Sequence, residues 1–218
     1  MNKFVALPTY DFAFKNCDYR MLAILLHKFE YTQASKNEPF KMLMKWKYKE
    51  HKKQMIKEYG KTDRTWNRNF KKMIEYGFIE EYTDHYKIYN KNKENNADYK
   101  LIPYNIIKSF IEDDISNTEI ANYILIYYKC HNYKLKTCFL THIPLIYFAE
   151  IMGTNISNSF RDYIGDRIEG EYCEGAGVLT KLEENGYIKI KTKKEKSPKG
   201  NFNINTYHFI PILEWFKT

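Results

Sequence analysis

The spacing of apolar residues changes twice along the chain, each time from the period of a helix to that of a strand. In the first half, Lys72–Tyr76 continues a helical pattern up to Gly77, and alternation begins after it. In the second half, Lys181–Asn185 leads in the same way to Gly186. A glycine at such a junction supplies the left-handed conformation that ends a helix. The glycines lie about half of the 218-residue chain apart, so the repeat indicates two domains of one plan.

Earlier signals in each half also correspond. A short strand that ends in proline is predicted at Phe4–Pro8 and at Tyr99–Pro103. Each is followed by a polar cap and a helix that is apolar around most of its circumference, Met21–Leu26 and Ile120–Ile126, which indicates a buried central helix. The predicted caps are Asp18 for the first helix and Asn117 or Thr118 for the second.

The strands after each glycine are predicted to pair as hairpins. Phe78–Tyr82 returns as Tyr86–Tyr89, and Tyr187–Lys193 returns as Phe202–Phe209. The sequence therefore predicts an α+β protein with two domains, residues 1–98 and 99–218. Each would have a helical core and a C-terminal hairpin.

A pair of helices is predicted before Gly77. His51–Tyr59 forms the first, Gly60 breaks it, and Thr62 or Asp63 caps the second. In the second helix one apolar stripe is formed by residues at i, i+4, i+7 and i+8, which are Trp66, Phe70, Met73 and Ile74. The opposite side carries Arg64, Thr65, Asn67, Arg68, Lys71 and Lys72.

Positive charge is concentrated around this helix pair. The chain has a net charge of +8, and Lys41–Lys72 alone carries +9. Such a balance attracts polyanions. Arginine can read guanine edges and asparagine adenine edges in the DNA major groove. The alternative is that these are ordinary solvated charges on an amphipathic helix.

The stretch Thr62–Glu80 resembles winged helix-turn-helix proteins. It has a threonine early in the second helix, a basic face, an apolar pair, a glycine, and a strand that begins with an apolar residue, isoleucine and glutamate. The resemblance implies a tandem winged-helix protein, similar to plasmid replication initiators and phage replisome organisers, that binds origin DNA without cleaving it. In this domain the expected DNA-binding residues are Lys61, Thr62, Arg64, Thr65, Asn67, Arg68, Lys71 and Lys72.

The second half departs from the pattern. Pro144–Met152 is predicted as its first helix and Ile156–Ile168 as its DNA-reading helix, with candidate contacts Asn155, Ser157, Asn158 and Arg161. Several glycines between Gly165 and Gly177 indicate an inserted loop or a split helix. The Lys189–Lys199 hairpin carries a net charge of +5, which suits contact with phosphates or with the minor groove. The alternative is that these lysines only prevent the edge of the sheet from pairing with another chain. Its lysines are Lys189, Lys191, Lys193, Lys194, Lys196 and Lys199.

Signals of catalysis are missing from the sequence. There is no phosphate-binding P-loop motif and no His-x-His spacing. The scattered cysteines are expected to be reduced thiols. Cys130 and Cys138, with the histidines near them, are expected to be core or surface residues. Glu112–Asp114 is expected to be a linker or a helix cap. We expect no enzyme activity, cofactor or metal. No apolar run approaches the roughly 18–20 residues of a membrane helix, so a cytoplasmic protein is expected.

Three functions remain open at this stage. The first is origin binding, with double-stranded DNA and host replication proteins as partners. The second is transcriptional regulation at a promoter through the same contacts. The third is a protein-interaction module that contacts no DNA, although lysine is usually depleted from the core of a protein interface. Homodimer formation is left open.

Overall fold

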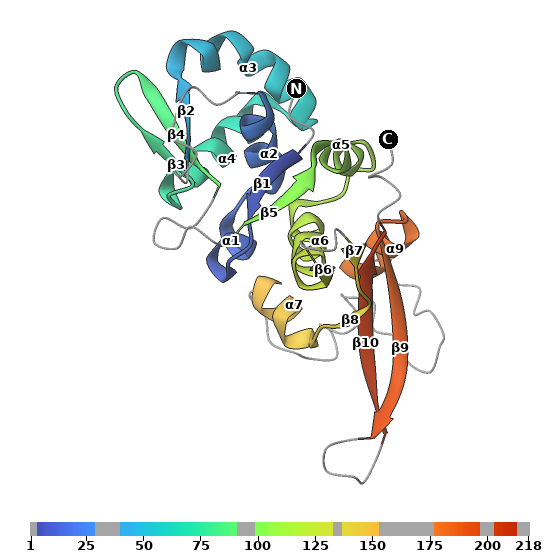
Figure 1. Ribbon diagram of the computed structural model, residues 1–218. Coiled ribbons are helices and arrows are strands. Elements are labelled where there is room, and N and C mark those ends of the chain that lie inside the picture. The colour runs from blue at the N-terminus through green and yellow to red at the C-terminus, as the bar shows by residue number, and fades with distance from the viewer. Residues whose placement is uncertain are drawn as a thin grey trace. The chain divides into compact units, whose positions relative to one another are not determined.

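The computed structural model describes residues 4–28, 40–90, 99–132, 137–152, 177–196 and 203–212 (Figure 1). The chain is a mixed α+β protein, which confirms the predicted class. It divides into two compact units, residues 1–117 and 118–218. Every helix in the described ranges is too short or too polar to cross a membrane.

The first unit is built around the buried helix α2. Residues Tyr19 to Leu26 of this helix are all buried, and the side chain of Asp18 caps it by accepting a hydrogen bond from the Met21 amide at 3.0 Å. This confirms the predicted cap. The elements of the unit are β1 (Phe4–Pro8), α1 (Asp11–Asn16), α2 (Tyr19–Lys28), β2 (Phe40–Met44), α3 (Lys45–Tyr59), α4 (Asp63–Glu75), β3 (Ile79–Glu81), β4 (His85–Tyr89), β5 (Tyr99–Pro103) and α5 (Tyr104–Glu112).

Two antiparallel sheets complete this unit. One has the strand order β2–β4–β3, so the strand before the helix pair lies beside the last strand of the hairpin. The other joins β1 to β5, with Val5 opposite Ile102. The strand predicted to open the second domain therefore pairs inside the first unit. For this reason the division between the units falls at residue 117, later than the predicted boundary at residue 98.

The described elements of the second unit follow the order helix, strand, two helices and hairpin that runs from α2 to β4 in the first unit, and a short two-stranded sheet is added after its first helix. Its central helix α6 is buried on most sides, and its main sheet has the order β8–β10–β9, again with the strand before the helices beside the last strand. Figure 1 shows β9 and β10 as a long ribbon. The elements are α6 (Asn117–Cys130), β6 (His131–Asn132), β7 (Thr137–Cys138), β8 (Thr141–His142), α7 (Leu145–Met152), α9 (Val178–Glu184), β9 (Ile188–Lys196) and β10 (Asn203–Pro211).

The helix ends before the two hairpins have the same geometry. Gly77 and Gly186 both have a φ of 75°. In each case the residue after the glycine donates its amide to a carbonyl five residues earlier, Phe78 to Met73 and Tyr187 to Leu182, at 2.9 Å. Most side chains would be strained at this φ, so glycine is favoured. The glycine caps predicted from the sequence are confirmed.

Candidate nucleic-acid interface

Helix α4 begins at a side-chain cap. Thr62 Oγ1 accepts a hydrogen bond from the Thr65 amide at 3.2 Å, which decides between the two predicted caps. Asp63 occupies the first turn, where a carboxylate is favourable, and lies 3.6 Å from Lys52 of α3. The preceding helix ends at Gly60, which has a φ of 72°. The turn between the two helices is therefore fixed at both ends.

Aromatic side chains hold the inner side of α4 against the unit. Trp66 is fully buried, and its Nε1 donates a hydrogen bond to the Tyr48 hydroxyl at 2.9 Å. Tyr48 stacks on Phe70 with ring centroids 4.9 Å apart, and Tyr59 meets the Trp66 ring edge-on at 5.3 Å. Burial raises the pKa of Tyr48 to about 12, so its hydroxyl stays protonated. The α4 aromatic cluster comprises Tyr48, Tyr59, Trp66, Phe70 and Tyr86.

A buried polar network joins α4 to α2 and α3. Asp18 Oδ2, at the start of α2, accepts a hydrogen bond from the Tyr59 hydroxyl at 2.5 Å and from Asn69 Nδ2 at 2.9 Å. Asn69 Nδ2 also lies 2.8 Å from the Tyr59 hydroxyl. Burial, and then the charge of Asp18, raise the pKa of Tyr59 above its usual range. These three residues, the Asp18 network, fix the roll of α4 around its own axis.

The outer side of α4 carries the cationic residues predicted for it. Arg64, Arg68 and Lys72 are exposed, and across the described ranges they form no ion pair with an acidic side chain. Lys71 is exposed and lies 3.9 Å from Glu75, a weak contact at this distance. Asn67 is exposed and donates to Asp63 at 2.8 Å, while Thr65 is half-buried. The α4 outer face comprises Arg64, Asn67, Arg68, Lys71 and Lys72.

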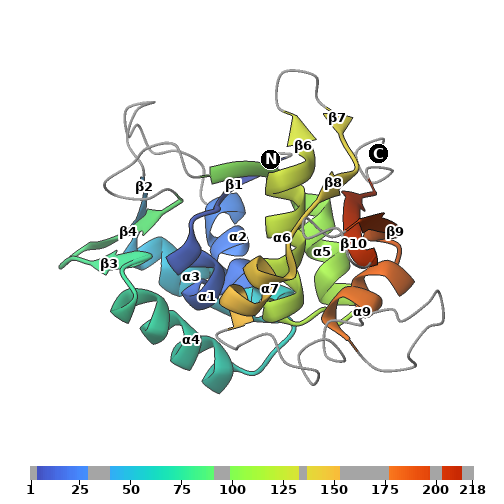
Figure 2. The same ribbon diagram turned by 90° about the horizontal axis from the view of Figure 1, so that it is seen from below.

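The predicted orientation of α4 is thus found, with Trp66 and Phe70 inside and the arginines outside. Figure 2 shows α4 along an edge of the first unit, with its sheet to one side. Contact of the α4 outer face with DNA stays a prediction.

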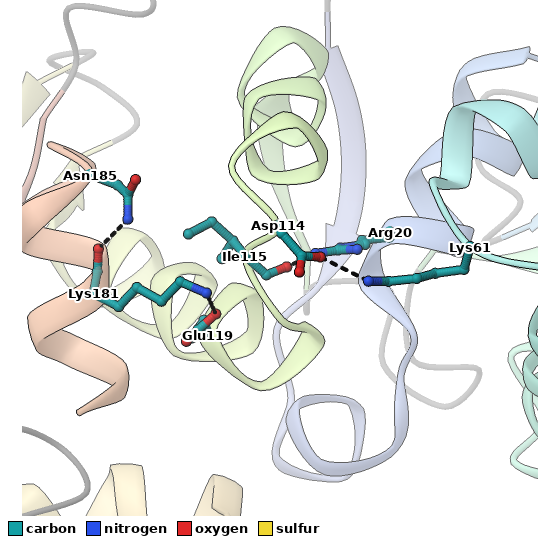
Figure 3. Close-up of polar contacts among 7 residues, drawn as sticks. All are labelled: Arg20, Lys61, Asp114, Ile115, Glu119, Lys181 and Asn185. Carbon is teal, nitrogen blue, oxygen red and sulfur yellow. Dashed lines mark hydrogen bonds and ion pairs between the residues drawn. The ribbon is translucent and has the colours of Figure 1, made fainter. Parts of the chain in front are cut away.

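Lys61 differs from the other predicted contacts because its charge has an internal partner. Its Nζ lies 2.8 Å from Asp114 Oδ1, which is also 3.8 Å from Arg20 (Figure 3). Arg20 is buried and donates to the Ile115 carbonyl oxygen. The acidic cluster at Glu112–Asp114 therefore ends α5, whose C-cap is Asp113, and neutralises the turn before α4.

The β3–β4 hairpin has acidic residues at its exposed end. Glu81 and Asp84 are exposed, and Glu81 is 2.6 Å from Lys45. The ring of Tyr82 stacks on His85 at 4.7 Å, and a hydrogen bond from His85 lowers the pKa of Asp84. Acidic side chains repel phosphates, so this hairpin is unsuited to the role that the lysines of β9 would have.

Comparisons with known proteins found no match to this chain. No protein-family model, curated protein or solved structure matches it. The function is therefore inferred from the geometry of the surfaces themselves.

The second unit has no counterpart of the α4 outer face among its described helices. The predicted helix at Pro144–Met152 is found as α7, but the helix that ends before Gly186 is α9. Its Lys181 lies 3.5 Å from Glu119, and its Glu183 accepts a hydrogen bond from the Ile190 amide. The predicted DNA-reading helix Ile156–Ile168 lies outside the described residues, so the inserted loop and the split helix both stay predictions. The predicted contacts that lie outside the described residues are Asn155, Ser157, Asn158, Arg161 and Lys199.

Strand β9 carries the remaining predicted lysines. Lys189 and Lys191 are exposed and alternate with Ile190, which is buried. Lys191 lies opposite His208 of β10. Further along the strand only the backbone is described, and this part holds Lys193, Lys194 and Lys196.

Two of the cysteines lie beside a histidine, because Cys130 precedes His131 in the chain and Cys138 lies opposite His131 in the β6–β7 pair. Cys130 is buried, its thiol donates to the Phe209 carbonyl oxygen at 3.2 Å, and burial raises its pKa to about 11. Within the described ranges no three His, Cys, Asp or Glu side chains lie close enough together to hold a metal ion.

Proposed function

We propose that this protein binds double-stranded DNA sequence-specifically, with the first unit acting as a winged helix and α4 lying in the major groove. The order α2, β2, α3, α4, β3, β4, with a β2–β4–β3 sheet, agrees with this arrangement. The observation that carries the proposal is the contrast between the two sides of α4. Its inner side is fixed by buried aromatic residues, while Arg64, Arg68 and Lys72 project from its outer side and form no ion pair with any residue that the structure describes.

The exposed side chains of α4 have the chemistry that reads base edges. Arg64 and Arg68 are one turn apart on one side, and a guanidinium can bond guanine O6 and N7 together. Asn67 lies beside them, although its amide nitrogen is held by Asp63. Lys71 and Lys72 follow about one turn later on the same exposed side and would meet phosphates. The lysines of β9 would add phosphate contacts that are independent of sequence.

We further propose that the bound DNA is a replication origin of a plasmid or phage, on the resemblance carried by Thr62–Glu80. The alternative is a promoter bound by a transcriptional regulator. Footprinting on the DNA that flanks the gene separates the two. An origin binder protects an array of repeats, whereas a regulator protects one or two sites that overlap a promoter.

The salt dependence of binding tests DNA contact itself. If lysines and arginines neutralise about six to eight phosphates, the log of the binding constant should fall with the log of salt concentration with a slope of about −5 to −7. Fluorescence anisotropy of a labelled duplex over a salt series measures this slope. A slope near zero would contradict the proposal and favour a module that binds proteins.

The change Arg68→Ala should relax sequence preference at one base pair and cost about 1–3 kcal/mol there. Binding-site selection from a randomised duplex, followed by anisotropy on single-base variants, measures the effect. The matched control is Lys191→Ala, which removes an exposed charge in the second unit and should weaken binding to all sequences alike. If Lys191→Ala relaxed the preference and Arg68→Ala did not, α4 would not be the reading element.

A further inference from the structure

Helix α3 presents a tryptophan to solvent. The side chain of Trp46 is 59% exposed, the largest exposed fraction among the large apolar side chains described. An indole usually buries most of its surface, so an exposed one in an ordered helix indicates a contact surface. Lys47 Nζ lies 5.4 Å from the centre of the ring, in the cation–π range. The ring is therefore exposed beside a positive charge.

A row of lysines continues from this indole along α3. Trp46, Lys49, Lys53 and Lys57 are spaced by three, four and four residues, so they share one side of the helix, and all are exposed. The buried residues Tyr48, Met55 and Tyr59 lie on the opposite side. We call the exposed side the Trp46–Lys57 stripe. At a rise of about 1.5 Å per residue it is about 17 Å long.

The acidic residues of α3 do not neutralise this stripe. Glu58 is half-buried and is bound to Lys28 at 3.1 Å and to the Tyr104 hydroxyl. Glu50 is exposed at the flank of the stripe, and its carboxylate lies 4.0 Å from His51 Nε2. Over the ranges that the structure describes, the three lysines of the stripe form no ion pair.

The stripe is also distinct from the α4 outer face. Lys52, which contacts Asp63 at the start of α4, marks the side of α3 that faces α4. The stripe is about a third of a turn away from Lys52, on the side opposite the core. Figure 1 shows α3 along one edge of the first unit, and Figure 2 shows α4 along another.

We infer that the Trp46–Lys57 stripe binds single-stranded nucleic acid, with an unpaired base stacked on Trp46 and phosphates on Lys49, Lys53 and Lys57. A flat aromatic side chain beside a basic row is the combination that binds unpaired strands. In a duplex the base faces are covered by neighbouring bases, so duplex DNA could use the lysines but not the indole. An acidic polypeptide would also match the charge, but it offers no stacked base. The site goes beyond the proposed duplex binding and does not depend on it.

Tryptophan fluorescence gives a direct test in the full chain. The protein has three tryptophans, and Trp66 is fully buried. In a Trp215→Phe background, Trp46 is therefore the exposed indole, and an oligothymidylate of about 20 nucleotides should quench it. Trp46→Ala should abolish the quenching and weaken oligothymidylate binding, measured by anisotropy, about tenfold or more. Trp46→Phe should keep part of the affinity.

Two further arms separate the contribution of charge from that of the duplex site. The double change Lys49→Gln and Lys53→Gln should make the salt slope for oligothymidylate less steep by about 1.4, because two contacts are lost at about 0.7 each. Arg68→Ala should weaken specific duplex binding and leave oligothymidylate binding unchanged. Urea unfolding of Trp46→Ala should match the parent, which shows that any loss is local.

Several results would overturn the inference. These are an unchanged affinity of Trp46→Ala for oligothymidylate, quenching absent at saturation, or quenching by polyglutamate at the same concentration as by oligothymidylate. The last result would identify an acidic polypeptide as the ligand. Failure of duplex binding alone would contradict the function proposed for α4 and leave this site intact, so the two proposals fail separately.

Discussion

Replacing Trp66 with alanine should lower the free energy of unfolding of the first unit by about 3–5 kcal/mol. The indole is fully buried between α3 and α4. Its removal leaves a cavity, and it also takes away the hydrogen bond to the Tyr48 hydroxyl and the edge contact with Tyr59. Tyr48 is itself buried, so its hydroxyl would lose a partner. Urea unfolding followed by far-ultraviolet circular dichroism measures the change.

Trp46→Ala is the matched control for this prediction. It removes the same side chain from the same pair of helices, but at an exposed position, so it should change the free energy of unfolding by no more than about 0.5 kcal/mol. Trp66→Phe should fall between the two, since it keeps ring packing and loses the hydrogen bond. Equal effects of Trp66→Ala and Trp46→Ala would contradict the role given to the α4 aromatic cluster.

The parts of the fold that follow from local periodicity were predictable. The stripe at Trp66, Phe70 and Met73, the cap at Thr62 and the helix ends at Gly77 and Gly186 depend on residues within two turns of one another. Local sequence determines such features because the helical period and the left-handed glycine position are short-range properties. The same local reasoning identified the side of α4 that would be exposed.

Strand β2 was not predicted, and the reason is visible in its burial. Lys41 and Leu43 are the buried positions of this strand, while Phe40 and Met42 are only half-buried. The lysine is accommodated because its Nζ donates to the Leu26 carbonyl oxygen at 2.5 Å. A lysine at an inward position reverses the expected alternation, so the pattern does not indicate the strand.

The start of α3 was placed too late for a related reason. The helix begins at Lys45, whereas the prediction began at His51. Of its first ten residues only Tyr48 is buried, so the apolar period that marks a helix is absent there. Pairing between distant segments was also beyond local pattern. The contact of β1 with β5 joins segments almost a hundred residues apart, and it moves the boundary between the units.

In the candidate site, too, features set by neighbouring residues could be predicted, while contacts between distant parts of the chain could not. The exposed cations of α4 were identified from the sequence, but the partners that modify them were not. Asp114 neutralises Lys61 across more than fifty residues, and Asn69 contacts Asp18, the cap of another helix about fifty residues earlier in the chain. In the sequence, the position of Asn69 beside the apolar stripe of α4 is the feature that indicates a partly buried polar contact. Identifying its partner needed the tertiary structure.

Asp18→Ala should lower the free energy of unfolding by about 2–4 kcal/mol, because it removes a helix cap and the hydrogen bonds that the Tyr59 hydroxyl and Asn69 Nδ2 donate to the carboxylate. One carboxylate oxygen caps α2 through the Met21 amide, and the other accepts from Tyr59 and from Asn69. Removing the carboxylate therefore loosens three helices at once. Chemical unfolding measures the loss, and Asp11→Ala, at an exposed position in α1, should stay within about 0.5 kcal/mol.

The same change separates positioning of α4 from contact with DNA. Because the Asp18 network fixes the roll of α4, Asp18→Ala should weaken duplex binding as well as stability, whereas Arg68→Ala should weaken binding alone. Asp18→Asn keeps the cap and the side-chain volume but places an amide donor or a weaker acceptor before Tyr59 and Asn69, so its loss of stability should be smaller. If Asp18→Ala unfolded at the same urea concentration as the parent, packing of the aromatic cluster alone would hold α4 in place.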